Sequence, residues 1–130
     1  MWIHFRKCLS LIKIIIPSSV KSIGDIAFYE CKSLEQIELP SSLEYIGSWS
    51  FANCTSLTQI TIPSSVNSMW REDFKGCSSL TNVKFESEVK FVDKNTFKNC
   101  SSLIQIIILS HFNLELNLKE IGSDVKIVKI

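Results

Sequence analysis

The sequence predicts an α/β solenoid, mostly β: a right-handed superhelix of about five 23-residue coils around one continuous core. Three observations support this prediction. Phenylalanine, cysteine and leucine each recur at one constant interval, apolar and polar residues alternate after each leucine, and Pro-Ser-Ser follows three of the alternating segments. A regular interval of this kind is typical of proteins that stack one small unit of structure on the next.

The repeated positions form columns that stay in phase over five copies. The columns are Phe5, Phe28, Phe51, Phe74 and Phe97; Cys8, Cys31, Cys54, Cys77 and Cys100; Leu11, Leu34, Leu57, Leu80 and Leu103; Ile14, Ile37, Ile60, Val83 and Ile106; and Ile16, Leu39, Ile62, Phe85 and Ile108. One coil cannot bury its own apolar side chains, whereas stacked coils share a core. We therefore expect a single domain over residues 1–130, with repeats starting near the five phenylalanines and a divergent C-terminal segment at 110–130.

The most regular unit, residues 28–52, predicts the elements of one coil. Apolar and polar residues alternate from 34 to 39, which indicates a strand with one buried face, and Pro40 ends it because proline has no N–H for a ladder. A second extended segment follows at 43–46, and Gly47 is expected to form a sharp corner with positive φ. The stretch 49–54 is too short for a stable helix and is expected to form a single helical or 3₁₀ turn.

These units resemble a known family. The pattern F-x-x-C-x-S-L-x-x-I-x-I-P-S-S-V-x-x-I-G over about residues 5–112 is similar to the BspA-like class of leucine-rich repeats. The resemblance implies a leucine-rich-repeat fold and a place among surface proteins of bacteria and protists, often adhesins. It suggests a cell-surface or secreted protein, although no clear signal peptide stands out: Lys13 interrupts the apolar run that follows Arg6 and Lys7. Departures occur at Glu86, which replaces the proline, and at Trp70 and Asp93, which replace the glycine.

The C-terminal segment departs from the repeat most clearly. Residues 118–122 match 43–47 only after a shift of six positions, which predicts a small insertion at about 110–117. The final segment, 125–130, alternates like a strand and is expected to close the last coil.

Composition and motifs argue against several classes of function. The net charge of +1 supplies no basic excess for nucleic acid, and no apolar run approaches the roughly 18 residues of a membrane-spanning helix. The cysteines have no close pair and the two histidines, His4 and His111, lie near the chain ends, so neither a zinc site nor a disulfide framework is predicted. The cysteines are expected to be small buried hydrophobic residues. No catalytic residue and no cofactor is predicted, and an enzyme is not expected.

The outward positions of the predicted strands are the candidate binding face. They are rich in amides and poor in charge, and the central ones are Gln36, Glu38, Gln59, Thr61, Asn82 and Lys84. An extended solenoid face of this kind suits a protein ligand, with a glycan as the alternative. The favoured function is non-catalytic protein binding or adhesion. An architectural segment of a longer array, or an intracellular scaffold or regulator, remain open.

Two other features leave alternatives open. Outward positions become apolar in the first and last units, at Ile12, Ile15, Ile104 and Ile107. Truncation of a longer array, self-association through uncapped ends, and cover by the C-terminal segment each explain this. Asn53 and Asn99 fit the glycosylation sequon, but asparagine is also a common turn residue before the repeated cysteine.

Overall fold

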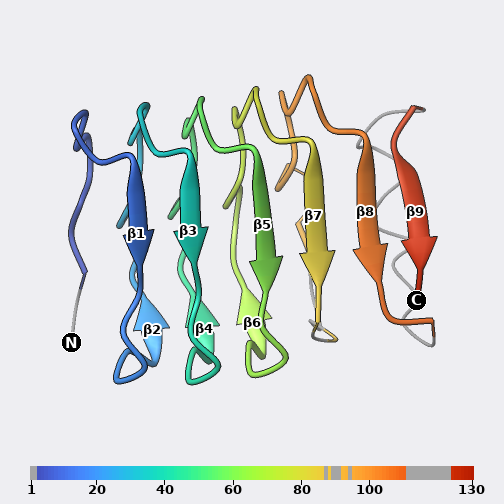
Figure 1. Cartoon of the computed structure of the whole chain (residues 1–130), viewed down its shortest axis with the longest axis horizontal. Coiled ribbons are helices and arrows are strands. Elements are labelled where there is room, and N and C mark those ends of the chain that lie inside the picture. The colour runs from blue at the N-terminus through green and yellow to red at the C-terminus, as the bar shows by residue number, and fades with distance from the viewer. Residues whose placement is uncertain (1–2, 87, 89–91, 94, 111–123) are drawn as a thin grey trace.

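The computed structural model describes residues 3–86, 88, 92–93, 95–110 and 124–130, and these form a β-solenoid with parallel sheets (Figure 1). One strand of every coil lies in a row along the stack, with the N-terminus at one end and the C-terminus at the other. These strands are β1 (Lys13–Ile15), β3 (Gln36–Glu38), β5 (Gln59–Ile62), β7 (Asn82–Phe85), β8 (Gln105–Ile108) and β9 (Lys126–Lys129). We call this row the sheet face. Its strands carry the alternating pattern that the sequence predicts.

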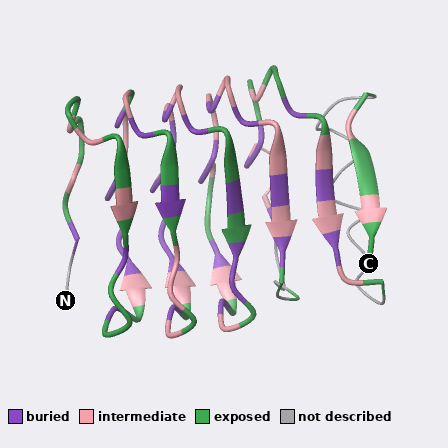
Figure 2. Ribbon diagram, viewed as in Figure 1, coloured by how far each residue is buried: buried purple, intermediate pink, exposed green. Residues whose placement is uncertain are grey.

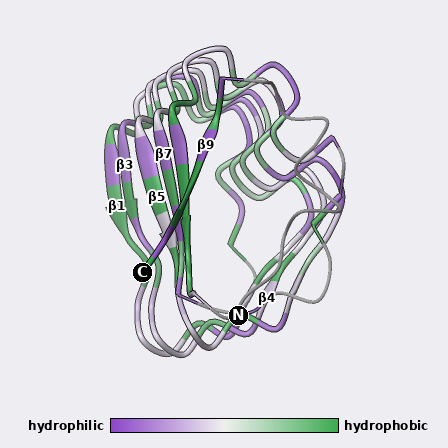
Figure 3. Cartoon of the chain, turned by 90° about the vertical axis from the view of Figure 1, so that its right-hand side faces the viewer, coloured by the Kyte–Doolittle hydropathy of each residue, from purple (hydrophilic) through white to green (hydrophobic). Residues whose placement is uncertain are grey.

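A second, narrower sheet forms from the extended segment after each Pro-Ser-Ser turn. Its strands are β2 (Ser22–Ile23), β4 (Tyr45–Ile46) and β6 (Ser68–Met69), in the order β2-β4-β6. The register is one repeat per strand: Ser22 pairs with Tyr45, and Tyr45 pairs with Ser68. Figure 3, which looks along the stack, places β4 across the coil from β1, β3 and β5.

The predicted inward columns form the core. Phe28, Phe51 and Phe74 have no exposed surface, and the rings of the phenylalanine column stack face to face, with centroids 5.3–5.8 Å apart. Buried residues line the inside of every central coil, while the outward residues of β3 and β5 are exposed and those of β7 and β8 are half-buried (Figure 2). The solenoid fold predicted from the sequence is confirmed.

The cysteines are more than small apolar residues. Cys31, Cys54 and Cys77 are buried, Cys8 and Cys100 are half-buried, and all five are free thiols. Each thiol from Cys31 to Cys100 donates a hydrogen bond to the phenylalanine carbonyl of the preceding coil, with sulfur–oxygen distances of 2.8, 3.1, 3.1 and 3.1 Å. Each of these carbonyls also accepts a hydrogen bond from the N–H of the cysteine three residues later, so the thiol is a second donor that comes from the next coil. The cysteine column therefore links coils through polar contacts that the sequence pattern does not reveal.

The corner between the two sheets consists of turns. Ala52 N–H donates to Trp49 O and Cys54 N–H donates to Phe51 O, both with the i-to-i−3 spacing of 3₁₀ geometry. These turns do not extend into helices, and the described residues contain no helix. The expected helical turn is therefore an isolated 3₁₀-type turn, and the α part of the predicted class reduces to these turns.

Positive φ angles occur in this corner, but not where the sequence predicts them. The prediction for Gly47 is wrong: the described glycine with positive φ is Gly76. Gly47 is needed for space, because a Cβ there would lie 2.5 Å from Asp25 Oδ1. One left-handed position of the repeat is instead the residue before the cysteine, where φ lies between 56° and 76° at Lys7, Glu30, Asn53, Gly76 and Asn99. A second left-handed position holds Ile26, Trp49 and Glu72, with φ between 52° and 61°.

The departures from the repeat have local consequences. Glu86 N–H donates to Ile62 O at 2.9 Å, a bond that a proline cannot make, and β5 and β7 are longer than β1 and β3. The final strand-like segment forms β9, which pairs with β8 as expected, although the step from Gln105 to Lys126 is shorter than the regular step from Asn82 to Gln105. The matching segment at 118–122 and most of the insertion predicted at 110–117 lie outside the described residues.

One ionisable side chain lies inside the corner. Asp73 is fully buried and accepts hydrogen bonds from Trp70 N–H at 3.1 Å and from Ser50 Oγ at 3.3 Å. Burial raises the pKa of Asp73 from 3.8 to about 8, because these bonds do not replace the lost hydration of a carboxylate. The folded chain therefore holds Asp73 protonated at neutral pH.

Ile26 is predicted to be a strained position. It is a β-branched residue with φ of 52°, a conformation in which its branched side chain is crowded, and it is 37% exposed. We expect Ile26→Asn to raise the free energy of unfolding by about 1 kcal/mol, because asparagine tolerates the left-handed region. Ile12→Asn is the control, since Ile12 is exposed without a positive φ. Denaturant melts in which Ile26→Asn stabilises no more than Ile12→Asn would contradict the assignment.

Asp73 is predicted to make stability depend on pH. In the unfolded chain the carboxyl ionises near pH 4, whereas in the folded chain its pKa is about 8. Its protonated form is retained only by the folded chain in this window, so stability falls as pH rises from 4 to 8, by up to about 1.4 kcal/mol per pH unit. Asp73→Asn removes this pH dependence of stability, because asparagine does not ionise. We expect the stability of the variant relative to wild type to increase with pH in melts at pH 5, 6.5 and 8. Parallel curves for the two proteins would contradict the prediction.

Candidate functional site

The sheet face presents the predicted candidate residues on adjacent strands. Gln36 and Glu38 lie on β3, Gln59 and Thr61 on β5, and all four are exposed. Asn82 and Lys84 lie on β7 and are half-buried. The pairing of β5 with β7 sets Gln59 beside Asn82 and Thr61 beside Lys84. The structure therefore brings the six residues onto one surface.

The sheet face is interrupted between β3 and β5. Hydrogen-bonded ladders join β1 to β3 and join β5, β7, β8 and β9, whereas no ladder joins the described strands β3 and β5, which lie side by side. The same two coils remain paired on the other side through β4 and β6. A hollow of about 400 Å³ lies at this interruption, lined by Ile37, Glu38, Leu39, Gln59 and Thr61. We call this interruption the seam.

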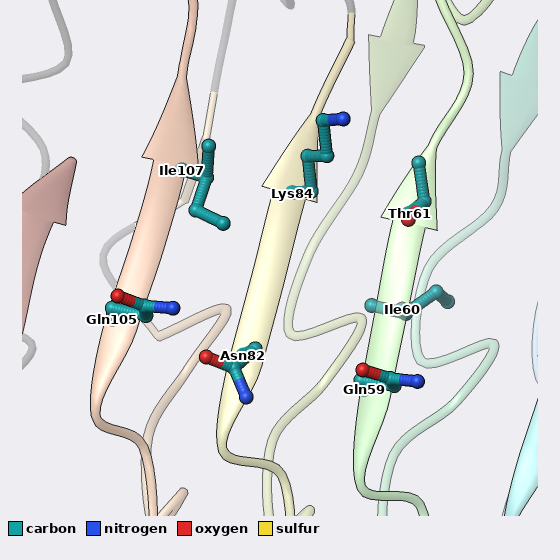
Figure 4. A pocket seen from close by; sticks show the side chains of 7 residues that line it. All are labelled: Gln59, Ile60, Thr61, Asn82, Lys84, Gln105 and Ile107. Atoms are coloured by element: carbon teal, nitrogen blue, oxygen red, sulfur yellow. The ribbon is translucent and has the colours of Figure 1, made fainter. Parts of the chain in front are cut away.

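A second hollow of about 320 Å³ continues across the sheet face from the seam (Figure 4). It is lined by Gln59, Ile60, Thr61, Asn82, Lys84, Gln105 and Ile107. One side is held by a short network: Asn82 Nδ2 donates to Thr81 Oγ1 at 2.8 Å, and Thr81 Oγ1 donates to Thr58 O at 3.0 Å. The orientation of Asn82 is therefore fixed by its neighbours, while Figure 4 shows Gln59, Lys84 and Gln105 extending over the strands.

Five of the six predicted residues line these hollows, and Gln36 is exposed beside them. The predicted set omits Gln105 and Ile107, which also line the second hollow. The sequence signal for them was available, since Gln105 lies one repeat after Asn82 and Ile107 lies one repeat after Lys84. The seam had no signal in the sequence, because the residues of β3 and β5 follow the same pattern as their neighbours.

The chemistry of this surface is that of hydrogen bonding and apolar contact. Its side chains are amides, a hydroxyl, one carboxylate and one ammonium, together with the apolar Ile37, Leu39, Ile60 and Ile107. Among the described residues, no group of three His, Cys, Asp or Glu side chains is placed to hold a metal ion. The Cys54 and Cys100 thiols are poor nucleophiles, since burial raises the pKa of each to about 12 and keeps it protonated.

The described residues include no helix long and apolar enough to cross a membrane.

Comparisons with known proteins agree with this architecture. The model of the BspA type leucine rich repeat region matches residues 3–125, with six copies. A search of curated proteins gives no significant match. A leucine rich cell surface protein from Faecalibacterium prausnitzii is 30% identical, with a TM-score of 0.80 over 95% of this chain and 32% of its own. A leucine rich repeat protein from T. pallidum is 29% identical, with a TM-score of 0.83 over 100% of this chain and 62% of its own.

A leucine-rich repeat protein from Bacteroides ovatus is also similar, at 26% identity and a TM-score of 0.75 over 98% of this chain and 39% of its own. The chain thus spans less than two thirds of each of these three proteins. The repeated columns, the parallel strand ladders and the family match over residues 3–125 lead to one conclusion: the chain belongs to the BspA-type leucine-rich-repeat family.

Proposed function

We propose that the chain is a non-catalytic recognition module that binds a protein ligand on the sheet face, with the seam at the centre of the contact. The observation that supports this proposal is the pair of adjoining hollows, which share Gln59 and Thr61. Likeness to a leucine rich cell surface protein adds support for a role at a cell surface.

The surface around the seam suits a protein ligand for two reasons. At the seam, no ladder joins the described strands β3 and β5, and the exposed side chains of Glu38, Gln59 and Thr61 offer hydrogen bonds to a ligand on either side of it. The second hollow, on β5, β7 and β8, combines amide donors and acceptors with Ile107, a mixture of polar and apolar contact that is typical of non-obligate interfaces. An architectural role in a longer array is the alternative, in which this surface binds nothing.

The proposal predicts that residues on both sides of the seam contribute to one contact. Glu38→Lys with Gln59→Ala changes charge and hydrogen bonding on either side of it. We expect this double variant to lose at least tenfold in capture of a protein ligand from a cell-surface extract, measured by quantitative mass spectrometry, since central contacts are the costliest to remove. The free energy of unfolding should change by less than about 0.5 kcal/mol, because both residues are exposed.

Glu44→Lys with Asn67→Ala is a matched control on the same two coils, with the same charge change at exposed positions outside the sheet face. We expect it to leave capture unchanged. If the control pair abolishes capture and the seam pair does not, the recognition surface lies on the other side of the solenoid. If neither pair affects any captured protein, the architectural alternative holds.

The N-terminal end favours a second candidate function, self-association. A hollow of about 380 Å³ there is lined by Ile3, His4, Phe5, Ile14, Ile15, Ile16 and Pro17. Ile12 and Ile15 are 57% and 61% exposed, and among the described strands β1 is paired with β3 alone. An unpaired strand edge with exposed apolar side chains favours pairing with another chain.

We expect concentration-dependent association of the isolated chain, which Ile12→Lys with Ile15→Thr should reduce. Sedimentation velocity at several concentrations measures both effects. A monomer at all concentrations up to about 1 mM, where even a weak contact of about −4 kcal/mol is half occupied, would exclude this second function.

A further inference from the structure

Two pairs of aromatic side chains lie outside the sheet face: Tyr29 and Trp49 in the turns of the corner, and Tyr45 on β4 with Trp70 directly after β6. The rings of Tyr29 and Trp49 are 6.2 Å apart with an interplanar angle of 51°, and those of Tyr45 and Trp70 are 6.3 Å apart at 59°. Each pair joins two adjacent coils. The near-identical geometry makes the pairs comparable, and their surroundings differ.

The first pair is occupied by cations of the chain itself. The Arg6 guanidinium lies over the Tyr29 ring, 5.8 Å from its centroid, and Lys75 Nζ lies 5.1 Å from the centroid of Trp49. The negative face of an aromatic ring attracts a cation at such distances, most strongly for tryptophan. In this pair the chain supplies both the rings and the positive charges.

The second pair has the same rings without the cations. Among the residues that the structure describes, no lysine or arginine group lies over the Tyr45 or Trp70 ring. Trp70 is 49% exposed, a large fraction for a tryptophan. An exposed aromatic side chain of this size, beside a second ring, is typical of the central residues of protein interfaces.

A carboxylate lies beside Gly47, at the end of the strand that carries Tyr45, and is held in place by the backbone. Asp25 is exposed, and its Oδ1 accepts a hydrogen bond from Ser48 N–H at 2.8 Å. The absence of a side chain at Gly47 leaves room for the Asp25 carboxylate, because a Cβ there would lie 2.5 Å from Oδ1. Gly47 directly follows β4, which carries Tyr45, so the Asp25 carboxylate lies at the end of the strand that holds this ring.

We propose that Tyr45, Trp70 and Asp25 form a second binding site, which takes an arginine or lysine side chain from a basic segment of a partner protein. The cation lies over the Trp70 and Tyr45 rings, as Arg6 and Lys75 lie over the first pair, and the free Oδ2 side of Asp25 accepts its hydrogen bonds. Arginine suits the site better than lysine, since its planar guanidinium stacks on a ring while its N–H groups bond a carboxylate.

Binding of a cation at this site depends on the local arrangement of the rings and Asp25, and not on the net charge of the chain. The chain has a net charge of +1, so it does not attract cations as a whole. Arg71 follows Trp70 and its N–H donates to Ser48 Oγ at 3.4 Å, so a like charge borders the site. A basic segment is therefore selected by the ring faces and by Asp25, and its binding does not depend on the seam.

The test uses the complete chain and three hexapeptides at about 0.15 M salt: hexa-arginine, hexa-glutamate and an uncharged Gly-Ser hexapeptide. Isothermal titration and the tryptophan indole signals in NMR spectra report binding. We expect hexa-arginine to bind, to shift the Trp70 indole signal and to weaken about tenfold in Trp70→Ala and in Asp25→Asn, as expected for the loss of one desolvated cation–aromatic or charge-assisted contact. Trp70→Phe keeps a ring and should retain part of the affinity.

Asp124→Asn is the matched control, because it removes the same charge from an exposed aspartate just before β9. Equal losses in Asp124→Asn and Asp25→Asn would show diffuse charge attraction and overturn the proposal. Unchanged affinity in Trp70→Ala, with a wild-type melting temperature, would overturn it as well. Binding of a neutral oligosaccharide in place of the peptide, lost in Trp70→Ala, would identify a saccharide site instead. None of these outcomes bears on the sheet face, which the Glu38 and Gln59 variants test separately.

Discussion

The contact between one coil and the next is the interaction on which the rest of the structure depends. Phe28 N–H donates to Ser50 O, Phe51 N–H donates to Asp73 O, and each bond joins a coil to its successor. The Cys54 and Cys77 thiols donate in the opposite direction, to carbonyls of the preceding coil. A coil by itself has no neighbour to bury its phenylalanine or to satisfy these groups, so stability arises between repeats more than within them.

The repeat made the fold predictable, whereas features that depend on contacts between coils could not be predicted from it. The apolar columns that stay in phase over five copies indicate which side chains face inward, because each such column must point into the core that the stacked coils share. The outward residues of the strands followed from the same alternation. The prediction for Gly47 fails because a repeated glycine indicates either positive φ or close approach, and the neighbour that decides between them, Asp25, belongs to the preceding coil and is remote in the sequence.

Other features depend on interactions that no pattern of residue types encodes. The thiol hydrogen bonds require the position of a carbonyl in the preceding coil, and cysteine in a buried column reads equally well as an apolar residue. The aromatic pairs arise from positions that differ between repeats, so they form no column: Trp49 and Trp70 occupy different places in the unit. Residues that follow the repeat form the core of the solenoid, while residues that depart from it give this solenoid surface features that other coils do not share.

The seam between β3 and β5 also affects how the solenoid unfolds. In a solenoid, cooperativity passes from each repeat to its neighbour, so the weakest interface determines where partial unfolding stops. At the seam the coupling on one side rests on side chains without a backbone ladder, while β4 and β6 still join the two coils on the other. The strands β1 and β3 thereby form a unit of lower cooperativity. This unit is able to fray while β5, β7, β8 and β9 keep their amides protected from solvent exchange.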